Sequence, residues 1–116
     1  MLTLPPSVRV SLAAGATDMR RSVDGLRALV QKSGMGDPYS GHLFVFRNRR
    51  GDRLKILVWD RSGFWVLYKR LEKGTFAWPE TNDAGVMSIH AADLALLLSG
   101  VDLSRTKSRA WYQRAA

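Results

Sequence analysis

The feature that most constrains the fold of this sequence is a series of short apolar segments separated by turn-forming loops between residues 42 and 79. Two of these loops share one pattern, NRRG at 48–51 and DRSG at 60–63. Asn or Asp begins a type I turn well, and Gly accepts the left-handed conformation that closes a three-residue hairpin loop. A third loop, LEKG at 71–74, repeats the pattern without the Asn or Asp. The pattern predicts a four-stranded antiparallel meander with strands near 42–48, 52–60, 64–71 and 75–79.

Before the meander, the alternation in SVRVSLAA predicts a strand over 7–14. Thr17 is then a candidate N-cap for a helix, because apolar residues recur at helical spacing after it and Gly34 can end it. The apolar stripe of this helix consists of Met19, Val23, Leu26 and Val30.

After the meander, residues 86–89 are a candidate short extended segment. His90 is then a candidate cap before a Leu-rich helix that runs to Ser99 and that Gly100 ends. The 116-residue length favours one domain. The sequence therefore predicts a single α+β domain over 1–104, an antiparallel meander of about four to five strands packed with two or three helices. Residues 105–116 are expected to form a basic, flexible C-terminal tail.

Three-residue loops would fix which residues of the meander face each other. Arg47 would lie opposite Arg53, Lys55 opposite Lys69, and Trp59 opposite Trp65. The two tryptophans would either stack on single-stranded nucleic acid or be buried under a helix, and the sequence leaves this open. The other face of the meander is expected to form the better core, with Phe44, Phe46, Leu54, Ile56, Val58, Val66, Tyr68, Phe76 and Trp78.

Charge is segregated along the chain. The net charge is +8; residues 47–73 carry nine basic and three acidic groups, whereas residues 74–104 carry four acidic groups and no Lys or Arg. The first and third loops of a meander lie at one end of the sheet, so eight of the nine basic residues should gather there. Like charges facing each other destabilise a sheet, and a bound anion would reverse that effect. The predicted contacts to nucleic-acid phosphate are Arg47, Arg49, Arg50, Arg53, Lys55, Lys69, Arg70 and Lys73.

No catalytic constellation can be assembled from the sequence. It has no cysteine, which excludes disulfides and thiolate chemistry, and GMGDPYSG at 34–41 lacks the Gly-Lys-Ser/Thr ending of a phosphate-binding loop. His42 and His90 have no second ligand at metal-binding spacing. The sequence therefore predicts no enzyme activity, no metal, no cofactor and no small-molecule substrate. It also contains neither an apolar run of membrane-spanning length nor a signal-peptide pattern, so a cytoplasmic location without membrane attachment is expected.

Several motifs together resemble one family: TDMR (17–20), GHLFVFRNRRGDRLKIL (41–57), YKRLEKG (68–74) and LLL-x-G-x-DL (96–103). The sequence is similar to the small accessory protein, often called TnpB or the second-open-reading-frame product, of insertion-sequence-66-type bacterial transposable elements. This protein is distinct from the RNA-guided nuclease that shares the TnpB name.

The resemblance implies a protein encoded beside a separate transposase, which carries the catalytic residues, and thought to assist transposition. It supplies no catalytic residue to carry over. We expect a non-catalytic accessory factor that binds DNA at the element ends through its basic hairpin and sheet end. The alternative is a protein-interaction module that docks on the transposase without contacting DNA, through the acidic segment 74–104 or the surface of the sheet.

Overall fold

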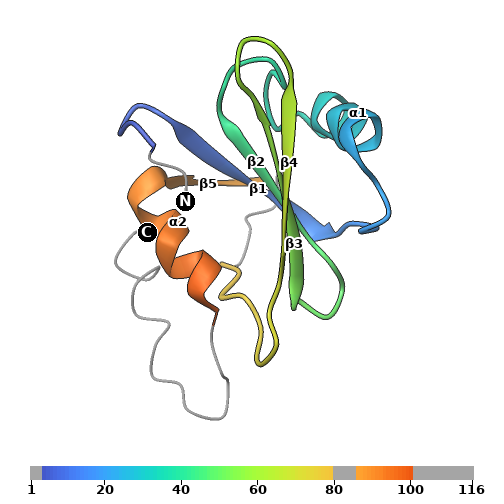
Figure 1. The fold of residues 1–116 in the computed structure, drawn as a ribbon, viewed down its shortest axis with the longest axis vertical. Helices are drawn as coiled ribbons and strands as arrows, with labels where there is room; N and C mark the ends of the chain where they lie inside the picture. The colour runs from blue at the N-terminus through green and yellow to red at the C-terminus, as the bar shows by residue number, and fades with distance from the viewer. Residues whose placement is uncertain (1–3, 80–85, 101–116) are drawn as a thin grey trace.

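The computed structural model describes residues 4–79 and 86–100 of the chain, and these form a five-stranded mixed sheet with two helices (Figure 1). The strand order is β4-β3-β2-β1-β5; β1 runs parallel to β2, and the other neighbours are antiparallel. The predicted α+β class is confirmed, whereas the predicted tail at 105–116 lies outside the described residues. The elements are β1 (Arg9–Ala16), α1 (Val23–Ser33), β2 (Leu43–Arg47), β3 (Arg53–Trp59), β4 (Phe64–Arg70), β5 (Val86–His90) and α2 (Ala91–Ser99).

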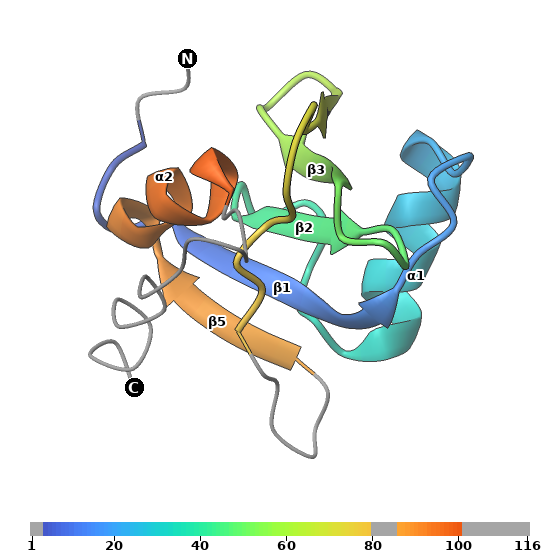
Figure 2. The same cartoon turned by 90° about the horizontal axis from the view of Figure 1, so that it is seen from below.

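The prediction of a fourth meander strand at 75–79 is wrong. Phe76 and Ala77 are adjacent in sequence and both are buried in the same core cluster, whereas successive side chains of a strand point to opposite faces of a sheet. The segment instead crosses the sheet after β4 (Figure 2), and the indole of Trp78 donates a hydrogen bond to the carbonyl of Ala13 at 3.3 Å. The sheet gains its further strand on the opposite side, where β5 joins β1 and confirms the extended segment expected at 86–89.

The helix between β1 and β2 begins later than the sequence suggested. The backbone N–H of Thr17 donates to the carbonyl of Arg47 at 2.8 Å, so Thr17 continues the pairing of β1 with β2 and does not cap a helix. A turn around Asp18 follows, and α1 starts at Val23. Gly34 ends the helix with φ 72°, as predicted, because glycine adopts this left-handed conformation without strain.

Each face of the sheet is covered by a helix (Figure 1). The side chains predicted to share the better core face are divided between the two faces, so that prediction is wrong: Phe44, Phe46 and Val66 pack on one side, and Leu54, Ile56, Val58, Phe76 and Trp78 on the other. We call the two sides the α1 face and the α2 face. On the α1 face, Leu26 and Val30 pack on Phe44, Phe46 and Leu57. The α2 face buries a second cluster that includes Leu94, Leu97 and Leu98 of α2 with Val10, Leu12, Val45, Leu54 and Ile56 of the sheet.

The first hairpin differs from the predicted register by one residue. Arg47 pairs with Leu54, and the N–H of Asn48 donates to the carbonyl of Arg53 at 3.0 Å, so Arg47 and Arg53 are not opposite each other. The cause is the side chain of Asn48, whose amide oxygen accepts hydrogen bonds from the N–H groups of Gly51, Asp52 and Arg53 at 2.9, 3.1 and 3.0 Å. These bonds hold a four-residue loop, 49–52, in place of the expected three-residue one.

The second hairpin is shifted by one residue for a different reason. The N–H of Asp60 donates to the carbonyl of Gly63 at 3.0 Å, which leaves a two-residue loop of Arg61 and Ser62. Arg61 has φ 84°, the positive value that type II′ turns require at their first loop position. Lys55 therefore pairs with Tyr68 and not with Lys69, and Trp65 pairs with Val58 and not with Trp59.

Candidate nucleic-acid interface

The observed register places cations on both faces of the sheet, although the sequence predicted Arg47, Arg53, Lys55 and Lys69 on a single face. Side chains alternate between the faces along a strand. Arg53, Lys55 and Arg70 share the α1 face with Leu57 and Val66, and Arg47 and Lys69 lie on the α2 face.

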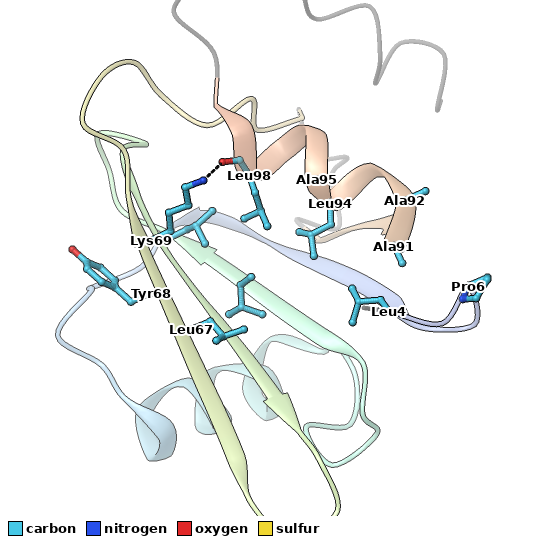
Figure 3. A pocket seen from close by; sticks show the side chains of 12 residues that line it. Leu4, Pro6, Leu67, Tyr68, Lys69, Ala91, Ala92, Leu94, Ala95 and Leu98 are labelled. Atoms are coloured by element: carbon cyan, nitrogen blue, oxygen red, sulfur yellow. Dashed lines mark hydrogen bonds between the residues drawn. The ribbon is translucent and has the colours of Figure 1, made fainter. Parts of the chain in front are cut away.

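The two cations on the α2 face contact the protein itself. The ammonium group of Lys69 donates to the carbonyl of Leu98 in the last turn of α2 at 2.8 Å (Figure 3), where the helix dipole favours a cation. The guanidinium of Arg47 lies 5.6 Å from the ring centroid of Trp78, and its Nη1 donates to the carbonyl of Asn48 at 3.2 Å. Both side chains therefore join the meander to the segments that cross the α2 face.

The cations on the α1 face form a compact array. Arg53 lies directly opposite Arg70, and the next pair on the same face is Lys55 with Tyr68, whose ring centroid lies 6.0 Å from the Lys55 ammonium. The hydrogen bond from Asn48 to Arg53 shows that the backbone of Arg53 bonds to β2, so Arg53 and Arg70 form a non-hydrogen-bonded pair. Side chains approach most closely in such pairs, and two like charges there destabilise the sheet.

The first and third loops lie at the same end of the sheet, as predicted. The N–H of Leu71 donates to the carbonyl of Asp52, and the N–H of Phe76 donates to the carbonyl of Gly51, both at 2.8 Å. This end therefore presents the exposed side chains of Arg49 and Arg50 in the first loop and of Lys73 in the third.

Arg21 belongs to this end as well, and sequence reasoning missed it. The ammonium group of Lys55 donates to the carbonyl of Arg21 at 2.7 Å, which brings the start of α1 against the cationic array. Because β1 and β2 are parallel, the end of β1 lies beside Arg47, and the chain enters α1 from there. We define the cationic end as Arg21, Arg49, Arg50, Arg53, Lys55, Arg70 and Lys73.

Acidic side chains neutralise part of the positive charge near the cationic end. The guanidinium of Arg20 contacts the carboxylate of Asp18 at 2.7 Å and lowers the pKa of Asp18 to about 2, so this pair is neutral overall at physiological pH. Arg70 contacts Glu72 at 3.2 Å in an exposed pair. A hydrogen bond from the side chain of Asn48 lowers the pKa of Asp52, which is therefore ionised. Asp52 and Glu72 thus offset only a minority of the seven cations.

The two tryptophans lie near the opposite end of the meander and have different environments. Trp59 is partly buried and packs edge-on against Tyr39 and Phe64, with centroid separations of 5.1 and 5.0 Å. Trp65 is 57% exposed on the α2 face, and its indole N–H bonds to the carboxylate of Asp60, whose pKa it lowers. A joint stacking platform of Trp59 and Trp65 beside the cations therefore does not form.

Within residues 4–79 and 86–100, no three His, Cys, Asp or Glu side chains form a group that could hold a metal ion. His42 uses its Nδ1 to accept the N–H of Arg9 at 2.9 Å. His90 occupies the predicted position before α2, although its side chain makes no capping hydrogen bond. No helix of the described chain is long and apolar enough to span a membrane.

A mixed five-stranded sheet with one helix on each face and a cluster of cations at one end defines a small α+β protein with a candidate polyanion-binding surface. The family model for IS66 Orf2-like proteins matches residues 8–108. The chain belongs to this family and is an accessory protein of an insertion sequence.

Two curated relatives come from Sinorhizobium fredii. The uncharacterized protein y4jC is 39% identical over 102 residues, which cover 88% of this chain and 86% of the relative. The uncharacterized protein y4hO is 42% identical over 102 residues, covering 88% of each chain. No solved structure matches the chain.

Proposed function

We propose that the protein is a non-catalytic accessory factor of DNA transposition that binds DNA through its cationic end and assists a separately encoded transposase. The observation that carries this proposal is the direct apposition of Arg53 and Arg70, with Lys55 at the next position on the same face. An apposition of like charges costs stability in the free protein, and a phosphate placed between them converts the repulsion into attraction.

Several features support phosphate binding without base readout. The cations sit on a sheet end and on two loop tips, where they form a broad surface. Lys and Arg contacts to phosphate fix the position of a protein on DNA but carry no sequence information themselves. The nearby start of α1 adds partial positive charge from its backbone N–H groups.

The proposal is tested by titrating the protein with duplex DNA from an element end and with unrelated duplex DNA of equal length, at several salt concentrations. If about six phosphates are neutralised, the affinity should fall roughly 1000-fold between 50 and 200 mM salt. The two DNA sequences should differ little in affinity. An affinity that does not change with salt would contradict phosphate binding by the cationic end.

A second function, docking on the transposase, is favoured by an apolar groove of about 490 Å³ between α2 and β4 (Figure 3). Leu54 and Ile56 form part of its floor, and Leu94, Leu98 and Leu67 form part of its walls. Retention of the transposase by the tagged protein in nuclease-treated lysate, combined with absent DNA binding, would favour this second function. The two functions are compatible, because loading a transposase on DNA uses a contact to each.

A further inference from the structure

β4 is seven residues long and lies at the edge of the sheet. Within the part of the chain that the structure describes, no strand pairs with its outer side. Its sequence, FWVLYKR, is uncharged over five residues and has two cations at its end. Trp65 and Tyr68, on opposite faces of this strand, are 57% and 52% exposed. Native proteins shield long apolar edges because their free backbone groups pair readily with another strand.

The hydrogen bonds of the second hairpin determine which residues of β4 have free backbone groups. Asp60 and Gly63 form a hydrogen-bonded pair, so Trp65, Leu67 and Lys69 bond to β3 in the alternation of an antiparallel ladder. The remaining residues direct their N–H and C=O groups outward. They are Phe64, Val66, Tyr68 and Arg70.

We propose that β4 pairs antiparallel with β4 of a second copy of this chain, about a two-fold axis at Leu67. In this register Phe64 lies opposite Arg70 of the second copy, and Val66 lies opposite Tyr68. All four outward-directed residues then meet outward-directed residues, so every free N–H and C=O group along the strand gains a partner. A shift by one residue would place outward-directed residues opposite inward-directed ones and lose the ladder.

The distribution of charge along β4 favours a second copy as the occupant. Antiparallel pairing places the cationic end of one strand against the aromatic end of the other, so no two cations of β4 face each other. Lys69 meets the exposed indole of Trp65, and Arg70 meets the ring of Phe64, which are favourable cross-strand pairs. The two-fold axis is perpendicular to the sheet, so the α1 faces of the two copies lie on the same side of the combined ten-stranded sheet. Both arrays of Arg53, Lys55 and Arg70 therefore lie on that side.

Cysteine crosslinking tests the register directly, because the chain has no native cysteine. Residue 67 faces its own copy in a non-hydrogen-bonded pair with Cα atoms about 4.5 Å apart, which a disulfide can bridge. The variant Leu67→Cys should therefore form a disulfide-linked dimer of twice 13.0 kDa under mild oxidation. Its matched control is Trp65→Cys, whose two copies would lie roughly 13 Å apart and should not crosslink. Equal crosslinking of the two variants, or no crosslinking of either, would overturn the proposal.

Light scattering of the full chain gives an independent test without cysteine. The wild type should be dimeric, and Tyr68→Pro should raise the dimer dissociation constant roughly 10- to 100-fold, because each copy loses an outward N–H while the ladder to β3 is kept. The control Tyr68→Thr removes the same ring but keeps the N–H, and it should remain dimeric. Circular dichroism verifies that both variants are folded. A monomeric wild type, or a Tyr68→Pro dimer as tight as wild type, would refute the pairing.

Discussion

Replacing Arg53, Lys55 and Arg70 together with Gln is expected to weaken DNA binding roughly 100- to 1000-fold at 0.1 M salt. The three side chains form one array on the α1 face, and Gln replaces each of them with a polar, uncharged side chain. Each lost phosphate contact should reduce the slope of the logarithm of affinity against the logarithm of salt concentration by about 0.9. Fluorescence anisotropy with labelled duplex DNA at several salt concentrations measures both quantities.

A matched control removes three positive charges from the opposite end of the sheet. Arg9, Lys32 and Arg61 are exposed at the start of β1, the last turn of α1 and the second hairpin loop. The triple variant Arg9→Gln, Lys32→Gln and Arg61→Gln has the same net charge as the array variant and should retain most of the affinity. Equal losses in the two triple variants would mean that net charge, and not the array, governs binding.

Asn48→Ala should lower the free energy of unfolding by about 2–4 kcal/mol, because one side-chain oxygen satisfies three backbone N–H groups of the first loop. The loop also carries Arg49 and Arg50 and supports the third loop through the carbonyls of Gly51 and Asp52. Urea denaturation followed by circular dichroism measures the loss.

Asp52→Ala serves as the control for Asn48→Ala. It removes the hydrogen bond that the Asn48 amide donates to the Asp52 carboxylate at 2.7 Å and one negative charge near Arg50 and Arg53, but it keeps the three bonds to the Asn48 oxygen. A loss of about 1 kcal/mol is therefore expected. Similar losses for the two variants would show that the three bonds to the amide oxygen do not determine the stability of the loop.

The sequence predicted the α+β class, the β2-β3-β4 meander and the meeting of its first and third loops at one end. It did not predict the register, because NRRG and DRSG look alike but form loops of different length. The side-chain oxygen of Asn48 accepts hydrogen bonds from three backbone N–H groups and holds a four-residue loop. Arg61, in contrast, adopts a positive φ in a two-residue loop. A shift of the register by one residue moves every side chain of a strand to the other face relative to its partner strand. The lengths of the two loops therefore determine which cations share a surface.

Arg21 and the segment 75–79 were misjudged for a different physical reason. Their positions depend on contacts between segments that are distant in sequence: the pairing of Ala16 with Arg47, and the bond from Trp78 to Ala13. Local patterns do not encode such contacts. Lys55 would have been assigned to the same surface by either register, but its contact with the carbonyl of Arg21 required the parallel pairing of β1 with β2.

The central claim, that DNA binds at the cationic end, is tested most directly by nuclear magnetic resonance of the isotope-labelled protein during a titration with duplex DNA. We expect amide shifts to concentrate at Arg21, in the first loop at 49–52, and at Arg53, Lys55 and Arg70, while Arg61 at the opposite end is unaffected. Shifts confined to α2 and the apolar groove, or shifts equally large at both ends of the sheet, would contradict binding at the cationic end.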